Sequence, residues 1–376
     1  MRRVCYVSGS RADFGLIART LALARSDPRL DPSVCVTGQH LCAAYGDTVR
    51  DIEESGLRIC ARVPVALDGS GGATMARAIG RELIGIVDAL ETEQPALVMV
   101  LGDRGEMLAG ALAAIHLNIP LVHLHGGERS GTVDEPVRHA ISKLAHYHFV
   151  STQGARERLI RMGERAERIF VTGAPGLDGL REEVDRSRTD LCRELGFDAR
   201  RPVALVVVHP VVQDAGVAGL HAATVLEAVL AAGCQTLCLT PNSDAGGQQV
   251  RSALAHYEEH RAVRIRTHLA RRDFASWLAA VDVMVGNSSS GIIEAAVFAL
   301  PVVNVGDRQT GRERSANVVD VPVEVGPIAA AIERALVTGK REVANVYGDG
   351  RASQRIVELL ASVPLDAALL RKSNAY

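Results

Sequence analysis

The sequence predicts an α/β protein built from two doubly wound, Rossmann-like domains that face each other across a cleft. Short β-branched runs alternate with Ala- and Leu-rich segments of helical periodicity along the whole chain. The runs are apolar throughout, a pattern typical of parallel strands that helices cover on both faces. Because the runs form two separate series, we expect two such domains, with ligands bound at the C-terminal ends of the strands.

Each series contains strand-like runs that end in a glycine, a small polar residue or a charge. The first series is "VCYVSG" (4–9), "SVCVTG" (33–38), "ALVMVLGD" (96–103), "PLVHLHGG" (120–127) and "YHFVST" (147–152). The second is "VALVVVHP" (203–210), "QTLCLTPN" (235–242), "VRIRTHL" (263–269), "VDVMVGNSSS" (281–290) and "PVVNVGD" (301–307). We therefore expect a first domain at residues 1–173 and a second at 174–359, with the C-terminal tail, about 360–376, packing back on the first.

The composition excludes several classes of protein. A net charge of -2 and an aromatic content of 3% argue against nucleic-acid binding, which needs a dense basic face and base-stacking rings. No apolar run reaches the roughly 18 to 20 residues of a membrane helix, and the N-terminus turns into a glycine loop too early for a signal peptide. We expect a cytoplasmic protein. Its 7 cysteines form no CxxC pair, which indicates reduced core thiols and no metal site.

The stretch "SGSRADFG" (8–15) forms the turn between the first expected strand and the following helix. Arg11 in this turn could reach an anion lying over the helix N-terminus. A surface arginine beside a tight turn is the alternative, and this motif alone leaves both open.

The stretch "VGNSSSGIIEAAV" (285–297) follows an apolar run and opens a helix. Capping that helix needs one serine, whereas Ser288, Ser289 and Ser290 are all present. Backbone N–H groups and hydroxyls therefore converge where the helix dipole favours a phosphate. Glu294 either complements the helix N-terminus or accepts hydrogen bonds from the two hydroxyls of a ribose.

His209 follows the first apolar run of the second domain. A lone histidine at a strand end is usually a capped polar residue, but beside a serine loop it is a candidate phosphate contact or proton donor to a leaving phosphate. Asn242 and Asp244 end another strand of this half and either line the same crevice or are plain turn residues.

Carboxylates follow two neighbouring strands of the first domain. Asp103 comes directly after a strand and a glycine, Glu128 takes the same position one strand later, and Asp134 and Arg138 begin the next helix. One such carboxylate would be a helix cap or a surface charge. Several carboxylates at neighbouring strand ends repel one another, which raises their pKa values. Such an arrangement is typical of acid/base sites, where a reaction uses the charge.

Together these motifs resemble the UDP-N-acetylglucosamine 2-epimerase family, and most closely its hydrolysing branch in sialic- and nonulosonic-acid biosynthesis. "SGSRADFG", "VTGQHL", "LGDR", "HLHGGE", "DEPVRH", "GNSSSG" and "NVGDRQTGR" occur in the family's order over nearly the whole chain. Gly105 departs from the family pattern, since many relatives carry an aromatic residue there. The stretch "TGQH" resembles one that helps to bind a second, activating nucleotide sugar in the non-hydrolysing branch.

The resemblance implies a glycosyltransferase-B-like fold and a homodimer. It also assigns roles to particular residues: diphosphate contacts to Arg11, His209, Ser288, Ser289 and Ser290, ribose binding to Glu294, and acid/base work to Asp103, Glu128 and Asp134, with Arg138 beside them and His209 as a further catalytic group.

The function implied is hydrolysing epimerisation of UDP-N-acetylglucosamine, releasing UDP and free N-acetylmannosamine for sialic-acid biosynthesis. The reaction would run by elimination to a 2-acetamidoglucal and rehydration, without cofactor or metal. The alternative is the same reaction on UDP-2,4-diacetamido-2,4,6-trideoxyglucose (UDP-N,N'-diacetylbacillosamine) for legionaminic-acid biosynthesis. Remoter alternatives are a non-hydrolysing 2-epimerase, a glycosyltransferase and a nucleotide-sugar sensor.

Overall fold

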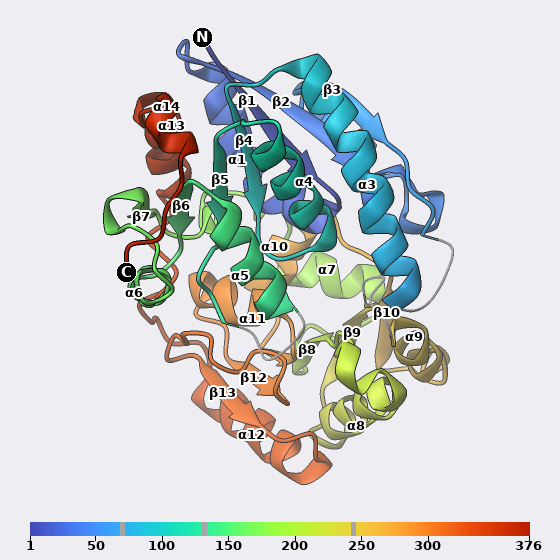
Figure 1. The fold of residues 1–376 in the computed structure, drawn as a ribbon. Helices are drawn as coiled ribbons and strands as arrows, with labels where there is room; N and C mark the ends of the chain where they lie inside the picture. Colours follow the sequence, from blue (N-terminus) through green and yellow to red (C-terminus); the bar gives the residue numbers. More distant parts are fainter. Residues whose placement is uncertain (68–71, 130–133, 242–245) are drawn as a thin grey trace. The chain divides into compact units, whose positions relative to one another are not determined.

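The computed structural model describes residues 1–67, 72–129, 134–241 and 246–376, and its contacts divide the chain into two compact units (Figure 1). Unit 1 comprises Met1–Glu128, Asp134–Asp178 and Tyr347–Tyr376, and unit 2 consists mainly of Gly179–Val346. The expected first boundary, after residue 173, lies close to this division. The expected second boundary, after residue 359, differs from it, because the chain already returns to unit 1 at Tyr347.

Unit 1 is built on a seven-stranded parallel sheet in the order β3-β2-β1-β4-β5-β6-β7. The strands are β1 (Arg2–Ser8), β2 (Leu30–Thr37), β3 (Arg58–Val63), β4 (Leu97–Leu101), β5 (Leu121–Leu124), β6 (Tyr147–Val150) and β7 (Ile169–Val171). The order reverses between β1 and β4, so the C-terminal ends of these two strands border the crevice in which such sheets bind ligands.

Helices cover both faces of this sheet, and the alternation of side chains along β1 explains why. Val4 and Tyr6 face a core shared with α1 (Arg11–Ser26), α2 (Val49–Glu54) and α13 (Ala352–Ser362). Cys5 and Val7 face a core shared with α3 (Gly72–Glu93), α4 (Gly105–His116) and α5 (Asp134–Leu144). A strand buried on both faces has no polar side, which accounts for the uninterrupted apolar runs. The remaining helices are α6 (Gln153–Arg161) and α14 (Ala367–Leu370).

Unit 2 repeats this design with a six-stranded parallel sheet in the order β10-β9-β8-β11-β12-β13. The strands are β8 (Val203–Val207), β9 (Gln235–Leu239), β10 (Val263–Arg266), β11 (Val283–Gly286), β12 (Val302–Val305) and β13 (Val318–Val321). The helices are α7 (Arg188–Leu195), α8 (Ala218–Ala231), α9 (Gly247–Ala255), α10 (Arg271–Ala280), α11 (Ser289–Ile293) and α12 (Val325–Thr338). Here the order reverses between β8 and β11.

Among the described residues, one helical segment, Gln213–Ala231, is long and apolar enough to cross a membrane. This differs from the expectation that no run reaches that length. The segment contains α8, whose buried side chains include Ala222, Val225 and Leu226 and pack into the core of unit 2. Packing on the sheet therefore accounts for part of its apolar composition, since 33% of the apolar window is buried. The cytoplasmic location stays a prediction.

Candidate active site

The carboxylates of unit 1 meet a buried arginine at the ends of the central strands. The Arg138 side chain, only 3% exposed, projects from α5 and forms an ion pair with Asp103, which follows β4. Its Nη1 lies 3.9 Å from Oε2 of Glu128, beyond the end of β5. Asp103, Glu128 and Arg138 are thus brought together, as the sequence predicted. A guanidinium between two carboxylates offsets the repulsion that would otherwise keep both charges apart.

Asp134 is the first residue of α5 and lies one turn before Arg138 on the same helix. Its side chain is half-buried. The structure therefore puts Asp134 on the helix that carries Arg138, and its acid/base role stays a prediction.

His125 is a member of this cluster to which the sequence analysis gave no role. It directly follows β5, and its Nδ1 lies 2.7 Å from Oε1 of Glu128. Ser151, after β6, donates from Oγ to the same carboxylate oxygen at 2.9 Å. The signal was visible in "HLHGGE", where a histidine follows an apolar run and precedes two glycines that permit a tight turn.

The end of β1 carries a second buried polar network, centred on Asp13. Its carboxylate accepts hydrogen bonds from Tyr6 Oη at 3.0 Å, Ser8 Oγ at 2.7 Å and Ser10 N at 2.6 Å. Because the Ser8 hydroxyl donates its hydrogen bond to Asp13, we assign Nε2 of His40, 2.9 Å away, as the donor to Ser8 Oγ. Burial lowers the pKa of His40, so the ring is held neutral. His40, in "TGQH", thus stabilises the turn before α1 through its hydrogen bond to Ser8.

Arg11 begins α1, and its guanidinium forms a two-point ion pair with Asp51, with Nη2 2.8 Å from Oδ1. The motif around Arg11 left a phosphate contact and a surface position open, and Asp51, 40 residues away in the chain, was not expected as its partner. The role of Arg11 as a diphosphate contact stays a prediction.

Unit 1 also buries carboxylates for which the sequence indicated no role, among them Glu82 on α3 and Glu106 on α4. Glu106 is paired with Arg104, whose Nε lies 2.8 Å from Oε1. Burial and the Glu106 charge raise the pKa of Glu82 to about 8. Glu82 therefore carries a proton at neutral pH. Its position between Ala78 and Ile86 on the buried face of α3 was the available signal.

In unit 2, the ends of the two switch-point strands are joined through Asn287. Its Oδ1 accepts a hydrogen bond from His209 N at 2.7 Å, and its Nδ2 donates to His209 O at 2.9 Å. Gly286 precedes it with φ of +133°, and a Cβ there would lie 2.1 Å from Val207 O, so only glycine allows the strands to approach this closely. His209 and the serine loop are therefore neighbours in space.

The serine loop caps α11. Ser288 is the N-cap residue and accepts a hydrogen bond from Ser290 N at 3.4 Å, and the two hydroxyls lie 2.8 Å apart. Glu294, at the other end of this helix, is buried in an ion pair with Arg271 of α10. The motif left two roles open for Glu294, at the helix N-terminus or with a ribose, and neither included this arginine. The phosphate and ribose roles of these residues stay predictions.

A cavity of about 130 Å³ lies at this edge of unit 2, lined in part by Asn287, Arg308, Asp307 and His221. Arg308 and Gln309 donate to the Asn287 carbonyl at 3.1 and 2.9 Å, so the segment after β12 closes one side of it. Asn242 and Asp244, the other residues expected near this crevice, lie outside the described residues.

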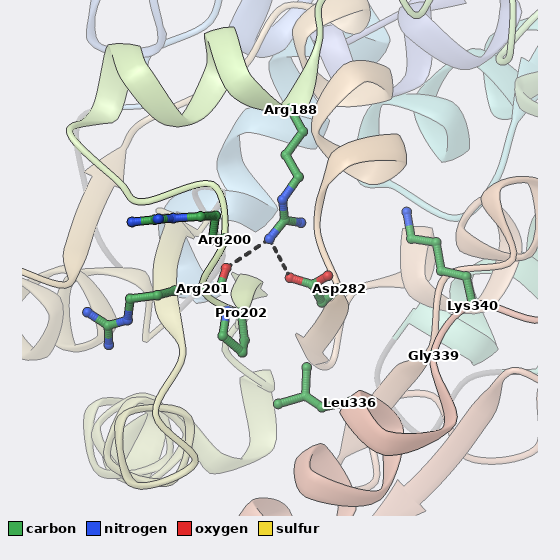
Figure 2. A pocket seen from close by; sticks show the side chains of 8 residues that line it. All are labelled: Arg188, Arg200, Arg201, Pro202, Asp282, Leu336, Gly339 and Lys340. Atoms are coloured by element: carbon green, nitrogen blue, oxygen red, sulfur yellow. Dashed lines mark hydrogen bonds and ion pairs between the residues drawn. The ribbon is translucent and has the colours of Figure 1, made fainter.

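A second pocket, of about 230 Å³, lies at the opposite edge of the unit 2 sheet, before β8 and β11 (Figure 2). Its Arg188 donates to Arg201 O and to Asp282 Oδ2, both at 2.8 Å, while the side chains of Arg200 and Arg201 point away from Asp282. Burial lowers the pKa of Lys340 to about 8. Arg188 thus joins the residues that precede β8 and β11. The pocket lies at the N-terminal ends of the strands, whereas doubly wound sheets bind ligands at the C-terminal ends.

The sequence profile of the UDP-N-acetylglucosamine 2-epimerase family matches residues 22–361 of this chain. The chain belongs to this family. It is 50% identical, over 100% of both chains, to UDP-N,N'-diacetylbacillosamine 2-epimerase (hydrolyzing) of Legionella pneumophila. It is 31% identical to the UDP-N-acetylglucosamine 2-epimerase of Neisseria meningitidis, over 96% of this chain and 95% of the relative. The enzyme is therefore a hydrolysing UDP-sugar 2-epimerase.

Solved structures confirm the fold. The UDP-GlcNAc 2-epimerase of Neisseria meningitidis bound to UDP-GlcNAc matches with a TM-score of 0.79 and 18% identity, covering 95% of this chain and 99% of that one. The UDP-GlcNAc 2-epimerase of Methanocaldococcus jannaschii in complex with UDP-GlcNAc and UDP matches with a TM-score of 0.79 and 19% identity, over 95% and 99%. The epimerase thus has two parallel-sheet α/β domains of the glycosyltransferase-B type.

Proposed function

We propose that the substrate of this 2-epimerase is UDP-N,N'-diacetylbacillosamine, and that the products are UDP and free 2,4-diacetamido-2,4,6-trideoxymannose. The observation that carries the proposal is the 50% identity over the full length of the Legionella pneumophila enzyme named for that substrate, against 31% for the Neisseria meningitidis enzyme named for UDP-N-acetylglucosamine. This supports the alternative of the sequence analysis over its main reading, the sialic-acid enzyme.

The chemistry explains why the site holds several acid/base groups. The C2 proton of a 2-acetamido sugar is not next to a carbonyl, so its direct removal and return is too difficult at neutral pH. If the C1–O bond to UDP breaks as the C2 proton leaves, the positive charge that develops at C1 makes that proton acidic. Water then adds across the resulting double bond. Elimination and hydration each need an acid and a base, and Asp103, Glu128 and Asp134 are the carboxylates we propose for them.

The leaving UDP needs groups that bind two negative phosphates. We propose the hydroxyls and backbone N–H groups of Ser288, Ser289 and Ser290 together with His209 and Arg11 for this role, and Glu294 for the ribose. Donors fixed before the reaction stabilise the charge that appears on the departing diphosphate, which is electrostatic catalysis. The proximity of His209 to Asn287, at the start of the serine loop, supports a shared task. The homodimer stays a prediction.

The substrate proposal is tested by assaying UDP release from UDP-N,N'-diacetylbacillosamine and from UDP-N-acetylglucosamine under identical conditions. The two sugars differ at C4 and at C6, and a single such difference in a fitted pocket typically gives about 10- to 200-fold discrimination. We therefore expect kcat/KM to favour the first by at least about that factor. A higher kcat/KM for UDP-N-acetylglucosamine would overturn the substrate assignment. Release of UDP from neither sugar would overturn the reaction as well.

A further inference from the structure

His125 is held in an unusual backbone conformation at the end of β5. Its φ is +60°, in the left-handed region that only a few per cent of residues other than glycine adopt, histidine being enriched there together with asparagine and aspartate. Such conformations cost free energy and persist where the surrounding structure fixes a functional group. The ring is also almost completely buried, with 6% of the residue exposed.

The hydrogen bonds around the ring determine which nitrogen carries the proton. Oε1 of Glu128 accepts the Ser151 hydroxyl at 2.9 Å and lies 2.7 Å from Nδ1 of His125. An ionised carboxylate can only accept hydrogen bonds, so Nδ1 must be the donor. The ring is then in the Nδ1–H form, and Nε2 bears a free lone pair.

This Nε2 is buried and has no hydrogen-bond partner among the residues that the structure describes. Leaving a buried polar atom unpaired is costly, and most such atoms have a partner in native proteins. A buried lone pair on an imidazole whose other nitrogen is fixed by a carboxylate is the arrangement of an oriented general base.

Both carboxylate oxygens of Glu128, unlike Nε2 of His125, face a neighbouring polar group among the described residues. Its side chain is 2% exposed, one carboxylate oxygen accepts the histidine and the serine, and the other faces Arg138 at 3.9 Å. A carboxylate enclosed in this way orients its neighbour better than it exchanges protons with a sugar.

We propose that His125 is a catalytic residue of the 2-epimerase. Glu128, one of the three carboxylates proposed above for acid/base work, is then a positioning residue that acts through His125, and Asp103 and Asp134 remain the carboxylates that exchange protons. This rests on the proposed reaction. A ring that begins with a free lone pair can first only accept a proton, so Nε2 takes the C2 proton during elimination. The electrons of the C2–H bond form the C1–C2 double bond, those of the C1–O bond leave with UDP, and Glu128 stabilises the resulting imidazolium.

The test compares His125→Asn, Glu128→Gln and the double variant by kcat for UDP release. Asparagine tolerates the left-handed conformation, so His125→Asn removes the base with little added backbone strain. We expect kcat to fall about 10²- to 10⁴-fold in His125→Asn, with UDP affinity unchanged, and the double variant to be no slower than His125→Asn. His256→Asn, at an exposed histidine on unit 2, is the matched control and should retain the wild-type kcat.

Two kinetic outcomes would overturn the inference. A kcat for His125→Asn within about threefold of wild type would remove His125 from the chemistry. A double variant slowed by the product of the two single effects would show that Glu128 acts on the substrate independently.

A second readout does not depend on turnover. ¹⁵N NMR of labelled histidines should show His125 as the Nδ1–H tautomer in the wild type and a shift toward Nε2–H in Glu128→Gln. An Nε2–H tautomer in the wild type would refute the assignment even if neither nucleotide sugar were turned over, so failure of this inference and failure of the proposed function are distinguishable.

Discussion

Asp103→Asn should lower kcat about 10²- to 10⁴-fold, the contribution typical of a general acid or base, and leave the affinity for UDP unchanged. Asparagine keeps an oxygen to accept the hydrogen bond of Arg138, so the buried arginine retains a partner. What is lost is the ability to exchange a proton. The measurements are UDP release under saturating substrate and calorimetric titration with UDP.

Ser290→Ala is compared with Asp103→Asn because it should change UDP affinity, which Asp103→Asn should not. Ser290 belongs to the loop proposed to bind phosphate. Losing one hydrogen bond to a charged group costs roughly 1.5 to 3 kcal/mol, so UDP affinity should fall about 10- to 150-fold. Unchanged UDP affinity in Ser290→Ala, or UDP affinity lost in Asp103→Asn, would contradict this division of work between the two units.

Glu82→Gln should stabilise the protein increasingly as the pH rises from about 4.5 to 8. Glu82 has a folded-state pKa raised to about 8 from its ordinary value of 4.5, because it is buried beside the Glu106 charge. In this window the folded chain holds a proton that the unfolded chain releases, so the stability present below pH 4.5 is progressively lost as the pH rises. At about 1.4 kcal/mol per pH unit, the loss reaches on the order of 4 kcal/mol by pH 8. Glutamine has the shape of the protonated acid and does not titrate.

Thermal unfolding of wild type and Glu82→Gln across pH 5 to 8.5 measures this effect. The difference in Tm should widen with pH over that range. Glu333→Gln, on the unit 2 helix α12, is a control glutamate that should leave the pH dependence unchanged. A Tm difference that stays constant with pH would contradict the buried, protonated state of Glu82.

The sequence predicted the fold well because most strands are buried on both faces. The strands that it did not count, β3, β7 and β13, are all at sheet edges. Their side chains are largely half-exposed or exposed, so "RICARV", "IFV" and "VVDV" lack the long apolar run that marked the interior strands. The edge strand β10 was predicted.

The candidate site was predictable to the extent that strand ends determine it. Asp103 and Glu128 follow neighbouring parallel strands, so their proximity followed from the fold alone. Partners from distant parts of the chain could not be predicted: Asp51 beside Arg11, Arg271 beside Glu294, and Glu106 beside Glu82. Spacing along one segment carries no information about which side chain of another segment will pack against it.

In the proposed reaction the enzyme eliminates UDP, releases a free sugar and protonates C2 from solvent. An NMR time course with UDP-N,N'-diacetylbacillosamine in deuterated water tests it most directly. We expect UDP to appear in step with free 2-epimerised sugar, and this sugar to carry deuterium at C2. Protium retained at C2, or accumulation of the 2-epimeric nucleotide sugar as the final product, would contradict it.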